Sequence, residues 1–167
     1  MDRMICKIHT LPVLRTEIKM YRALRHEQDK ITEDYETPLR ELENQLSEVE
    51  EELILVKSPG KSEGLGGCVQ DGLGKLNYLI DKKDKLKNER DDYIKANRDR
   101  YLTEFFEVKR RIDVIEYYLL KLDNADREFI EDFYVRKVTK TEVMKRYNIL
   151  NNKSLYRKAD NILMKML

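Results

Sequence analysis

Apolar residues recur along two segments of the chain at the alternating three- and four-residue spacing of a helical heptad. In the first segment they are Leu39, Leu42, Leu46, Val49, Leu53 and Val56, and in the second Phe105, Val108, Ile112, Ile115, Leu119 and Leu122. This spacing places one apolar stripe on each of two amphipathic helices. The stripes can bury each other as an antiparallel hairpin within one chain or as a coiled coil between chains, and the pattern leaves both arrangements open.

Two breaks interrupt the helical pattern before residue 75. Thr37-Pro38 predicts either a new helix start, with Thr37 as its cap, or a kink. All six glycines lie between Gly60 and Gly74, directly after Pro59, which predicts a loop or linker. The predicted layout is a helical or coiled-coil region over 1–57, a glycine-rich linker over 58–74, a long charged helix over 75–122 and a C-terminal domain over 123–167.

The C-terminal domain has the pattern of a helix-turn-helix. A short helix over about 127–135 follows a cap at Asp123 or Asn124. Thr139 and Glu142 have the spacing of a capping box at the start of the next helix, and Asn148 suits the left-handed conformation of a turn. Residues 151–154 cap a last helix whose apolar positions are Leu155, Ala159, Ile162, Leu163 and Met166. The predicted fold class is all-α, with long N-terminal helices and a C-terminal helix-turn-helix.

Composition argues against a large core, a membrane span and a catalytic or metal site. Charged residues make up 39% of the chain and tryptophan is absent, which favours long solvated helices. No apolar run approaches the ~18 residues that span a membrane, and the start lacks a signal-peptide stretch. Cys6 and Cys68 are expected to be reduced thiols in a cytoplasmic protein, because neither has the paired ligand spacing of a metal site. We therefore predict no enzyme activity, no metal, no cofactor and no membrane partner.

Charge is concentrated at the C-terminus. Residues 136–167 contain nine Lys/Arg and two acids, a net of +7, whereas the whole chain is +1 and residues 1–57 are −4. A basic helical end of this kind predicts double-stranded DNA as partner. The alternative is a solvated basic face that packs against protein.

The last helix is expected to enter the major groove, with Arg157 reading guanine and Asn151 or Asn152 contacting adenine or a phosphate. The face opposite its apolar stripe also presents Asp160 and Asn161. The basic residues around the preceding helix are expected to hold the phosphate backbone. The predicted DNA-binding residues are Lys140, Lys145, Arg146, Asn151, Asn152, Lys153, Ser154, Tyr156, Arg157 and Lys158.

Residues 123–167 resemble region 4 of bacterial sigma factors and, more closely, phage late transcription regulators of the ArpU/RinA type. The most specific parts are Leu155-Tyr156-Arg157-Lys158 and the segment 162–166, and the Ser58-Pro59 and glycine stretch matches the layout of that family. The segment 148–154 is one residue longer than the usual turn, and Met144 stands where the pattern has a small residue. The resemblance implies promoter-proximal DNA binding in the cytoplasm of a bacterial host, with RNA polymerase as a further partner.

Two other functions fit the same pattern. A phage DNA-packaging subunit of the small-terminase kind would join a helix-turn-helix to an oligomerising hairpin. A coiled-coil adaptor would bind protein alone. For the regulator, the N-terminal helices are expected to mediate self-association, giving a homo-oligomer, or contact with a partner.

Overall fold

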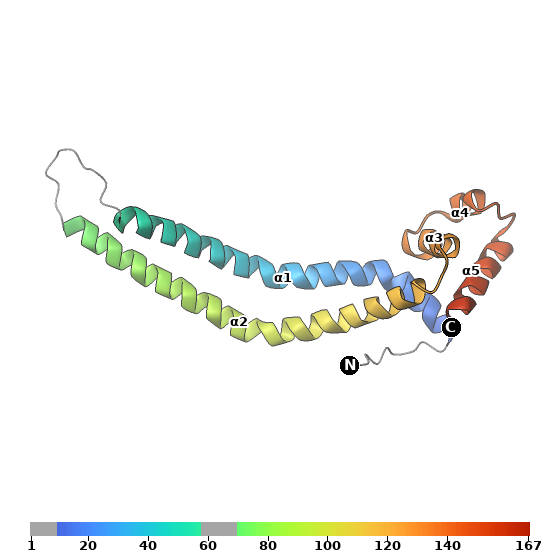
Figure 1. Cartoon of the computed structure of the whole chain (residues 1–167), viewed down its shortest axis with the longest axis horizontal. Coiled ribbons are helices and arrows are strands. Elements are labelled where there is room, and N and C mark those ends of the chain that lie inside the picture. The colour runs from blue at the N-terminus through green and yellow to red at the C-terminus, as the bar shows by residue number, and fades with distance from the viewer. Residues whose placement is uncertain (1–9, 58–69) are drawn as a thin grey trace. The chain divides into compact units, whose positions relative to one another are not determined.

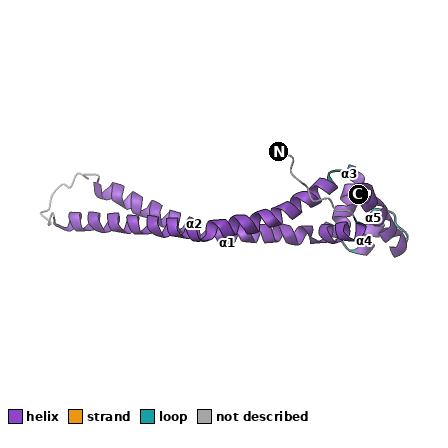
Figure 2. Ribbon diagram, turned by 90° about the horizontal axis from the view of Figure 1, so that it is seen from below, coloured by secondary structure: helices purple, strands orange, loops and turns teal. Residues whose placement is uncertain are grey.

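The computed structural model describes residues 10–57 and 70–167, and every regular element in these two ranges is a helix (Figures 1 and 2). The elements are α1 (Leu11–Lys57), α2 (Gln70–Leu119), α3 (Asn124–Ile130), η1 (Glu131–Val135), α4 (Lys140–Arg146) and α5 (Asn152–Met166), where η1 is one π-helical turn continuing α3. The all-α prediction is confirmed. The features predicted on Cys6, Cys68 and residues 58–69, including the first part of the linker, lie outside the described residues.

The chain forms two compact units, and both long helices contribute to each. Unit 1 comprises the described part of Met1–Lys30 together with Glu104–Leu167, and unit 2 the described part of Ile31–Thr103. The layout inferred from the sequence instead separated the C-terminal domain at residue 123. It differs because contacts between residues nearly 150 positions apart leave no local trace in the sequence.

Unit 2 is an antiparallel hairpin closed on the heptad seam. Leu46, Val49 and Leu53 of α1 form a buried cluster with Leu79 and Leu86 of α2. The intrachain arrangement is therefore the one that the structure adopts. Helix α2 begins at Gln70, so the predicted linker is helical from that residue to position 74. Glycine costs a helix only about 1 kcal/mol relative to alanine, which the following helical turns offset.

Helix α1 continues through Pro38, so the predicted new helix start there is wrong. Proline has no N–H, which leaves the Asp34 carbonyl without its α-helical donor. The Tyr93 hydroxyl lies 3.4 Å from that oxygen and donates to the Tyr35 carbonyl at 3.1 Å. The Tyr35 ring also stacks on Tyr101, with 4.2 Å between centroids. A side chain of α2 thus supplies a donor where the α1 backbone lacks one.

Unit 1 buries apolar side chains from every one of its elements. Leu14 and Ile18 of α1 and Ile115 of α2 are fully buried, as are Phe129 of α3 and Leu163 of α5. The predicted C-terminal domain began at residue 123 and included no residue of the two long helices. Unit 1 instead includes α1 from its start to Lys30 and α2 from Glu104 to its end.

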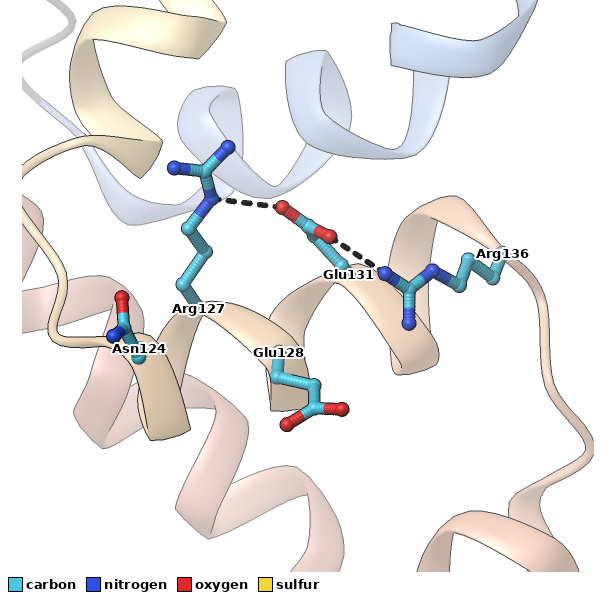
Figure 3. A pocket seen from close by; sticks show the side chains of 5 residues that line it. All are labelled: Asn124, Arg127, Glu128, Glu131 and Arg136. Carbon is cyan, nitrogen blue, oxygen red and sulfur yellow. Dashed lines mark hydrogen bonds and ion pairs between the residues drawn. The ribbon is translucent and has the colours of Figure 1, made fainter.

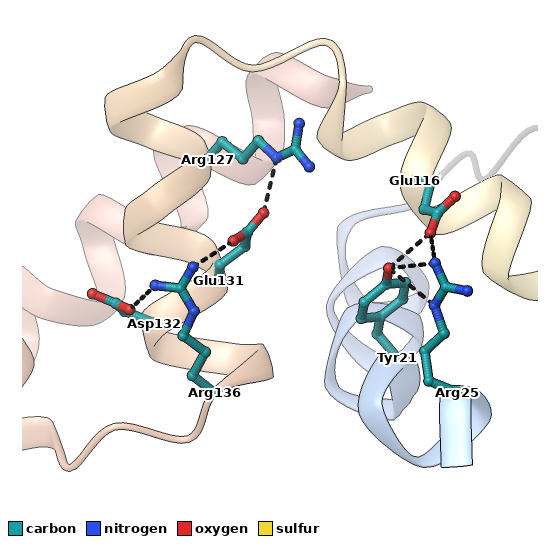
Figure 4. A network of polar contacts seen from close by, with 7 residues as sticks. All are labelled: Tyr21, Arg25, Glu116, Arg127, Glu131, Asp132 and Arg136. Carbon is teal, nitrogen blue, oxygen red and sulfur yellow. Dashed lines mark hydrogen bonds and ion pairs between the residues drawn. The ribbon is translucent and has the colours of Figure 1, made fainter. Parts of the chain in front are cut away.

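Polar contacts also join these segments of unit 1. Arg15 of α1 pairs with Asp160 of α5 at 2.5 Å, and Lys121 donates to the Met166 carbonyl at 2.9 Å. Arg25 and Tyr21 of α1 both contact the carboxylate of Glu116 on α2, as Figure 4 shows. The start of α1 is therefore tied both to α2 and to the last helix of the chain.

Candidate nucleic-acid interface

The three C-terminal helices begin at defined side-chain caps. Asp123 accepts a hydrogen bond from the Asp126 amide at 2.8 Å, which selects it over Asn124 as the cap of α3. The Thr139 hydroxyl accepts from the Glu142 amide, and the Glu142 carboxylate accepts from the Thr139 amide, both at 3.3 Å. The predicted capping box is confirmed. These hydrogen bonds from Thr139 lower the pKa of the Glu142 carboxyl.

Five residues, 147–151, connect α4 to α5. Asn148 has a φ of 51°, the left-handed conformation predicted for it, and the Ile149 amide closes the turn on the Met144 carbonyl at 2.8 Å. Asn151 Oδ1 then accepts from the Ser154 amide at 2.9 Å and caps α5. A second left-handed residue, Lys137 with φ 53°, ends the η1 turn, and nothing in the local sequence marked it.

A buried carboxylate connects η1 to the end of α4. Asp132 is fully buried and accepts from Arg136 Nη1 at 2.7 Å, from the Tyr147 hydroxyl at 3.0 Å and from Arg146. Burial by itself would raise the pKa of Asp132, but the hydrogen bonds from Tyr147, Arg136 and Arg146 outweigh it and hold the pKa below its ordinary value. Burial and Asp132 together raise the pKa of Tyr147 to about 12. This cluster fixes α4 against the helix before it, and Figure 4 shows its Asp132–Arg136 pair.

Helix α5 has one buried and one exposed face. All five residues predicted for its apolar face are buried, which confirms that assignment. The exposed face is centred on Lys153, Arg157 and Asn161, at successive four-residue steps. Asp160, expected on that face, is instead half-buried and bonded to Arg15, so its carboxylate anchors the helix.

The ten predicted DNA-binding residues fall into two groups, those without and those with interaction partners inside the fold. Lys145, Asn152, Lys153 and Arg157 are exposed and make no ion pair or side-chain hydrogen bond within the described part of the chain. The other six have structural partners. Arg146 is paired with Asp132, and Asn151 and Ser154 together form the cap of α5. Lys158 lies over the rings of Phe129 and Tyr147. Tyr156 meets the Phe133 ring edge-on, and Lys140 lies 5.2 Å from the Tyr156 ring centroid.

Two further exposed residues lie outside the predicted set. Asn161 extends the exposed face of α5 one turn beyond Arg157, and Lys137 is an exposed cation just before α4. The four-residue step from Arg157 to Asn161 is a signal that the sequence did contain. Lys137 could be found only once the chain reversal after η1 was known.

A hollow runs beside the exposed face of α5. Ser154, Arg157, Lys158, Asn161 and Lys165 line it from α5, and Asp126 lines it from α3. Lys165 is paired with Asp126 at 2.6 Å, so the positive charge that faces the hollow comes from Arg157 and Lys158. The bidentate donors of Arg157 match a guanine edge or a phosphate, and the amide of Asn161 matches an adenine edge.

A second hollow, lined by Asn124, Arg127, Glu128, Glu131 and Arg136, is an ion-pair network (Figure 3). Glu131 lies between two arginines, 2.8 Å from Arg127 Nε and 3.0 Å from Arg136 Nη2. Both arginines of this hollow are therefore already paired with a carboxylate. The hollow therefore has no excess positive charge for a phosphate.

The internal pairs reduce the charge available for binding. Residues 123–167 contain ten Lys/Arg and seven acids, a net of +3, because acids on α3 and η1 precede the basic tail. Four of the ten cations are paired with carboxylates: Arg127 and Arg136 with Glu131, Arg146 with Asp132, and Lys165 with Asp126. A fifth, Lys158, lies over the rings of Phe129 and Tyr147. Five exposed cations without an acidic partner in the described residues remain: Lys137, Lys140, Lys145, Lys153 and Arg157.

Other kinds of site have little structural basis in the described ranges. Within residues 10–57 and 70–167, no three His, Cys, Asp or Glu side chains come together as a metal-ion site. None of the helices in these ranges combines the length and the apolarity needed to cross a bilayer. Comparisons of the chain with family models, with curated protein sequences and with solved structures found no match.

Proposed function

We propose that unit 1 is a sequence-specific DNA-binding module that inserts α5 into the major groove, and that the protein is a transcription regulator of phage or prophage type. The observation that carries the proposal is the exposed face of α5. Its Lys153, Arg157 and Asn161 side chains are not occupied by the fold, and they follow a capped helix and a tight turn. A helix with polar side chains of these types on its exposed face fits the major groove.

Within this proposal the contacts fall into two groups. Arg157 and Asn161 read base edges, because their fork-shaped donor and acceptor groups match guanine and adenine. Lys140, Lys145 and Lys153 hold phosphates, which supplies affinity and register without sequence information. Asn151, Ser154 and Arg146 support the geometry of the interface from within the fold. The resemblance to late regulators extends the proposal to promoter DNA and to contact with RNA polymerase.

The salt dependence of affinity tests the electrostatic part of the proposal. At ~0.9 per neutralised phosphate, the slope of log affinity against log salt should lie between about −3, for the three lysines that hold phosphates, and about −5, for all five exposed cations. The measurement is a fluorescence-anisotropy titration on a duplex selected from random DNA, between low and moderate salt. An affinity that does not change with salt would contradict phosphate binding by this surface.

Paired substitutions test the division between reading and holding. Arg157→Ala should cost about 1–3 kcal/mol on the selected duplex and relax specificity at one base position. Lys145→Ala should weaken binding to selected and random duplexes by the same factor. Lys165→Ala is the matched control, because Lys165 lies on the same helix but is paired with Asp126. Equal losses on both duplexes for Arg157→Ala would contradict base reading by α5.

The DNA-packaging function remains the second candidate because one chain joins an α-helical hairpin to the helix-turn-helix. The mass of the assembly separates the two functions. One or two copies favour the regulator, and a ring of eight or more copies favours packaging. A protein-only adaptor would produce no shift of any duplex at low salt.

A further inference from the structure

Apolar side chains are exposed on both sides of the hairpin seam at the end of unit 2 where α1 stops and α2 begins. On α1 these are Ile54 and Leu55, which are 65% and 74% exposed. On α2 they are Leu73, Tyr78 and Ile80, which are 65%, 63% and 40% exposed. Together with Leu53 and Val56 of the seam, Ile54 and Leu55 make residues 53–56, a full turn near the end of α1, apolar on every side. Helices of that kind are normally covered by a further surface.

The ion pair between Glu50 and Lys83, at 2.7 Å, fixes which side of the seam each exposed residue occupies. Because the two helices are antiparallel, the residue five positions after Glu50 lies at the level of the residue five positions before Lys83. Leu55 is therefore level with Tyr78. Both lie on the side of the seam away from the ion pair, because successive helical residues are about 100° apart. Ile54 and Ile80 lie on the side of the ion pair.

The side with Leu55 and Tyr78 has its charges sorted by helix. Glu48 and Glu52 share the Leu55 face of α1, and Lys82 and Lys85 share the Tyr78 face of α2, at spacings of three, four and seven residues. All four are exposed. The only ion pair among them within the described residues is a surface contact of Lys85 with Glu89 at 3.8 Å, which contributes little. We call the two apolar residues and these four charged residues the sorted face: Glu48, Glu52, Leu55, Tyr78, Lys82 and Lys85.

We propose that the sorted face binds the sorted face of a second copy of this chain. A two-fold axis that lies in the interface and runs parallel to the helices places α1 of one copy along α2 of the other, so that the glutamates of each meet the lysines of the other. Leu55 then packs on the partner's Tyr78, and the four helices form a bundle. Packing α1 on α1 is disfavoured by repulsion, because residues 31–57 contain nine acids and two bases.

Charge reversal tests this packing with the full chain and without DNA, so its outcome is independent of the proposed function. The wild type should sediment at twice the 20.1 kDa chain mass. Glu48→Lys with Glu52→Lys makes the charged residues of the sorted face basic on both helices. Lys82→Glu with Lys85→Glu makes them acidic on both helices. Each double variant alone should sediment as a single copy. An equimolar mixture of the two should recover the doubled mass, because every crossing of α1 over α2 is again complementary.

Two further variants keep the test decisive if a double variant unfolds. The fourfold reversal restores complementarity both within and between chains, and it should fold and pair like the wild type. Ile54→Glu changes an equally exposed apolar residue on the other side of the seam, and it should also pair. A monomeric wild type, a ring of many copies, a mixture that stays monomeric, or loss of pairing in Ile54→Glu would each overturn the proposal.

Discussion

At the scale of single residues, Asp132 shows how the fold uses charges that look available in the sequence. Within Glu131-Asp132-Phe133-Tyr134 it resembles an ordinary surface acid, and Arg146 resembles a DNA contact. The structure buries the carboxylate and satisfies it with Arg136, Arg146 and Tyr147. A buried carboxylate requires such donors, because an unpaired charge in the interior is very costly. The arginines therefore support the geometry of α4 and its preceding helix through Asp132.

Asp132→Asn should destabilise the protein by about 1.5–3 kcal/mol, the range for hydrogen bonds to a charged group. The amide keeps the shape of the side chain but loses both ion pairs. Urea unfolding followed by circular dichroism measures the effect. Glu128→Gln, an exposed acid one turn earlier on the same element, is the control and should change stability little. Equal effects from the two variants would show that the hydrogen bonds and ion pairs of Asp132 contribute nothing to stability.

The same residue predicts a dependence on pH. The pKa of Asp132 is lowered from its ordinary 3.8 by Tyr147, Arg136 and Arg146 despite burial, so the folded state binds the proton more weakly than the unfolded state. Its stabilisation is fully present above the ordinary pKa and is lost as pH falls through the lowered value. The stability difference between wild type and Asp132→Asn should therefore be constant near neutral pH and shrink below about pH 4. A difference that persists at pH 2–3 would contradict the pairing.

At the scale of elements, prediction succeeded where the determining contacts are local. The capping box of α4, the left-handed Asn148 and the buried face of α5 each depend on residues within a few turns of one another. It failed at Pro38 and at the η1 turn. Pro38 normally ends a helix, but here α1 continues and a residue 58 positions away donates to its backbone. No local pattern could show that contact.

Tyr93→Phe should therefore destabilise unit 2 by about 1 kcal/mol, the net value of one hydrogen bond. Pro38→Ala restores the missing backbone donor to the Asp34 carbonyl, so the same Tyr93→Phe change should cost less in that background. A double-mutant cycle in urea measures the coupling. Tyr117→Phe is the control, because that tyrosine is on the same helix and exposed, and its hydroxyl makes no hydrogen bond within the described residues. Strict additivity would mean that the hydroxyl acts independently of the proline.

At the scale of the whole molecule, unit 1 is built from separated parts of the sequence. Its C-terminal helices bury apolar residues in the same unit as Leu14 and Ile18 of α1 and Ile115 of α2, and Arg15 and Lys121 contact α5. The apolar spacing predicted each helix but not this unit, because heptad patterns do not specify which distant segment completes a core. The predicted DNA-binding residues that remain exposed depend on that completion for their placement.

Residues 123–167 alone should consequently fail to fold, although they contain the whole helix-turn-helix. A segment of 45 residues seldom buries enough surface for stability, and this one would expose the faces that normally contact α1 and α2.

A second chain, with residues 44–89 replaced by a short glycine–serine turn, keeps every segment of unit 1 and the Tyr93 contacts. It should unfold cooperatively and bind the selected duplex. Because it lacks the sorted face, it should also sediment as a single copy. Cooperative folding of 123–167 would contradict the two-unit division, and a folded but non-binding shortened chain would place part of the DNA contact on the hairpin end.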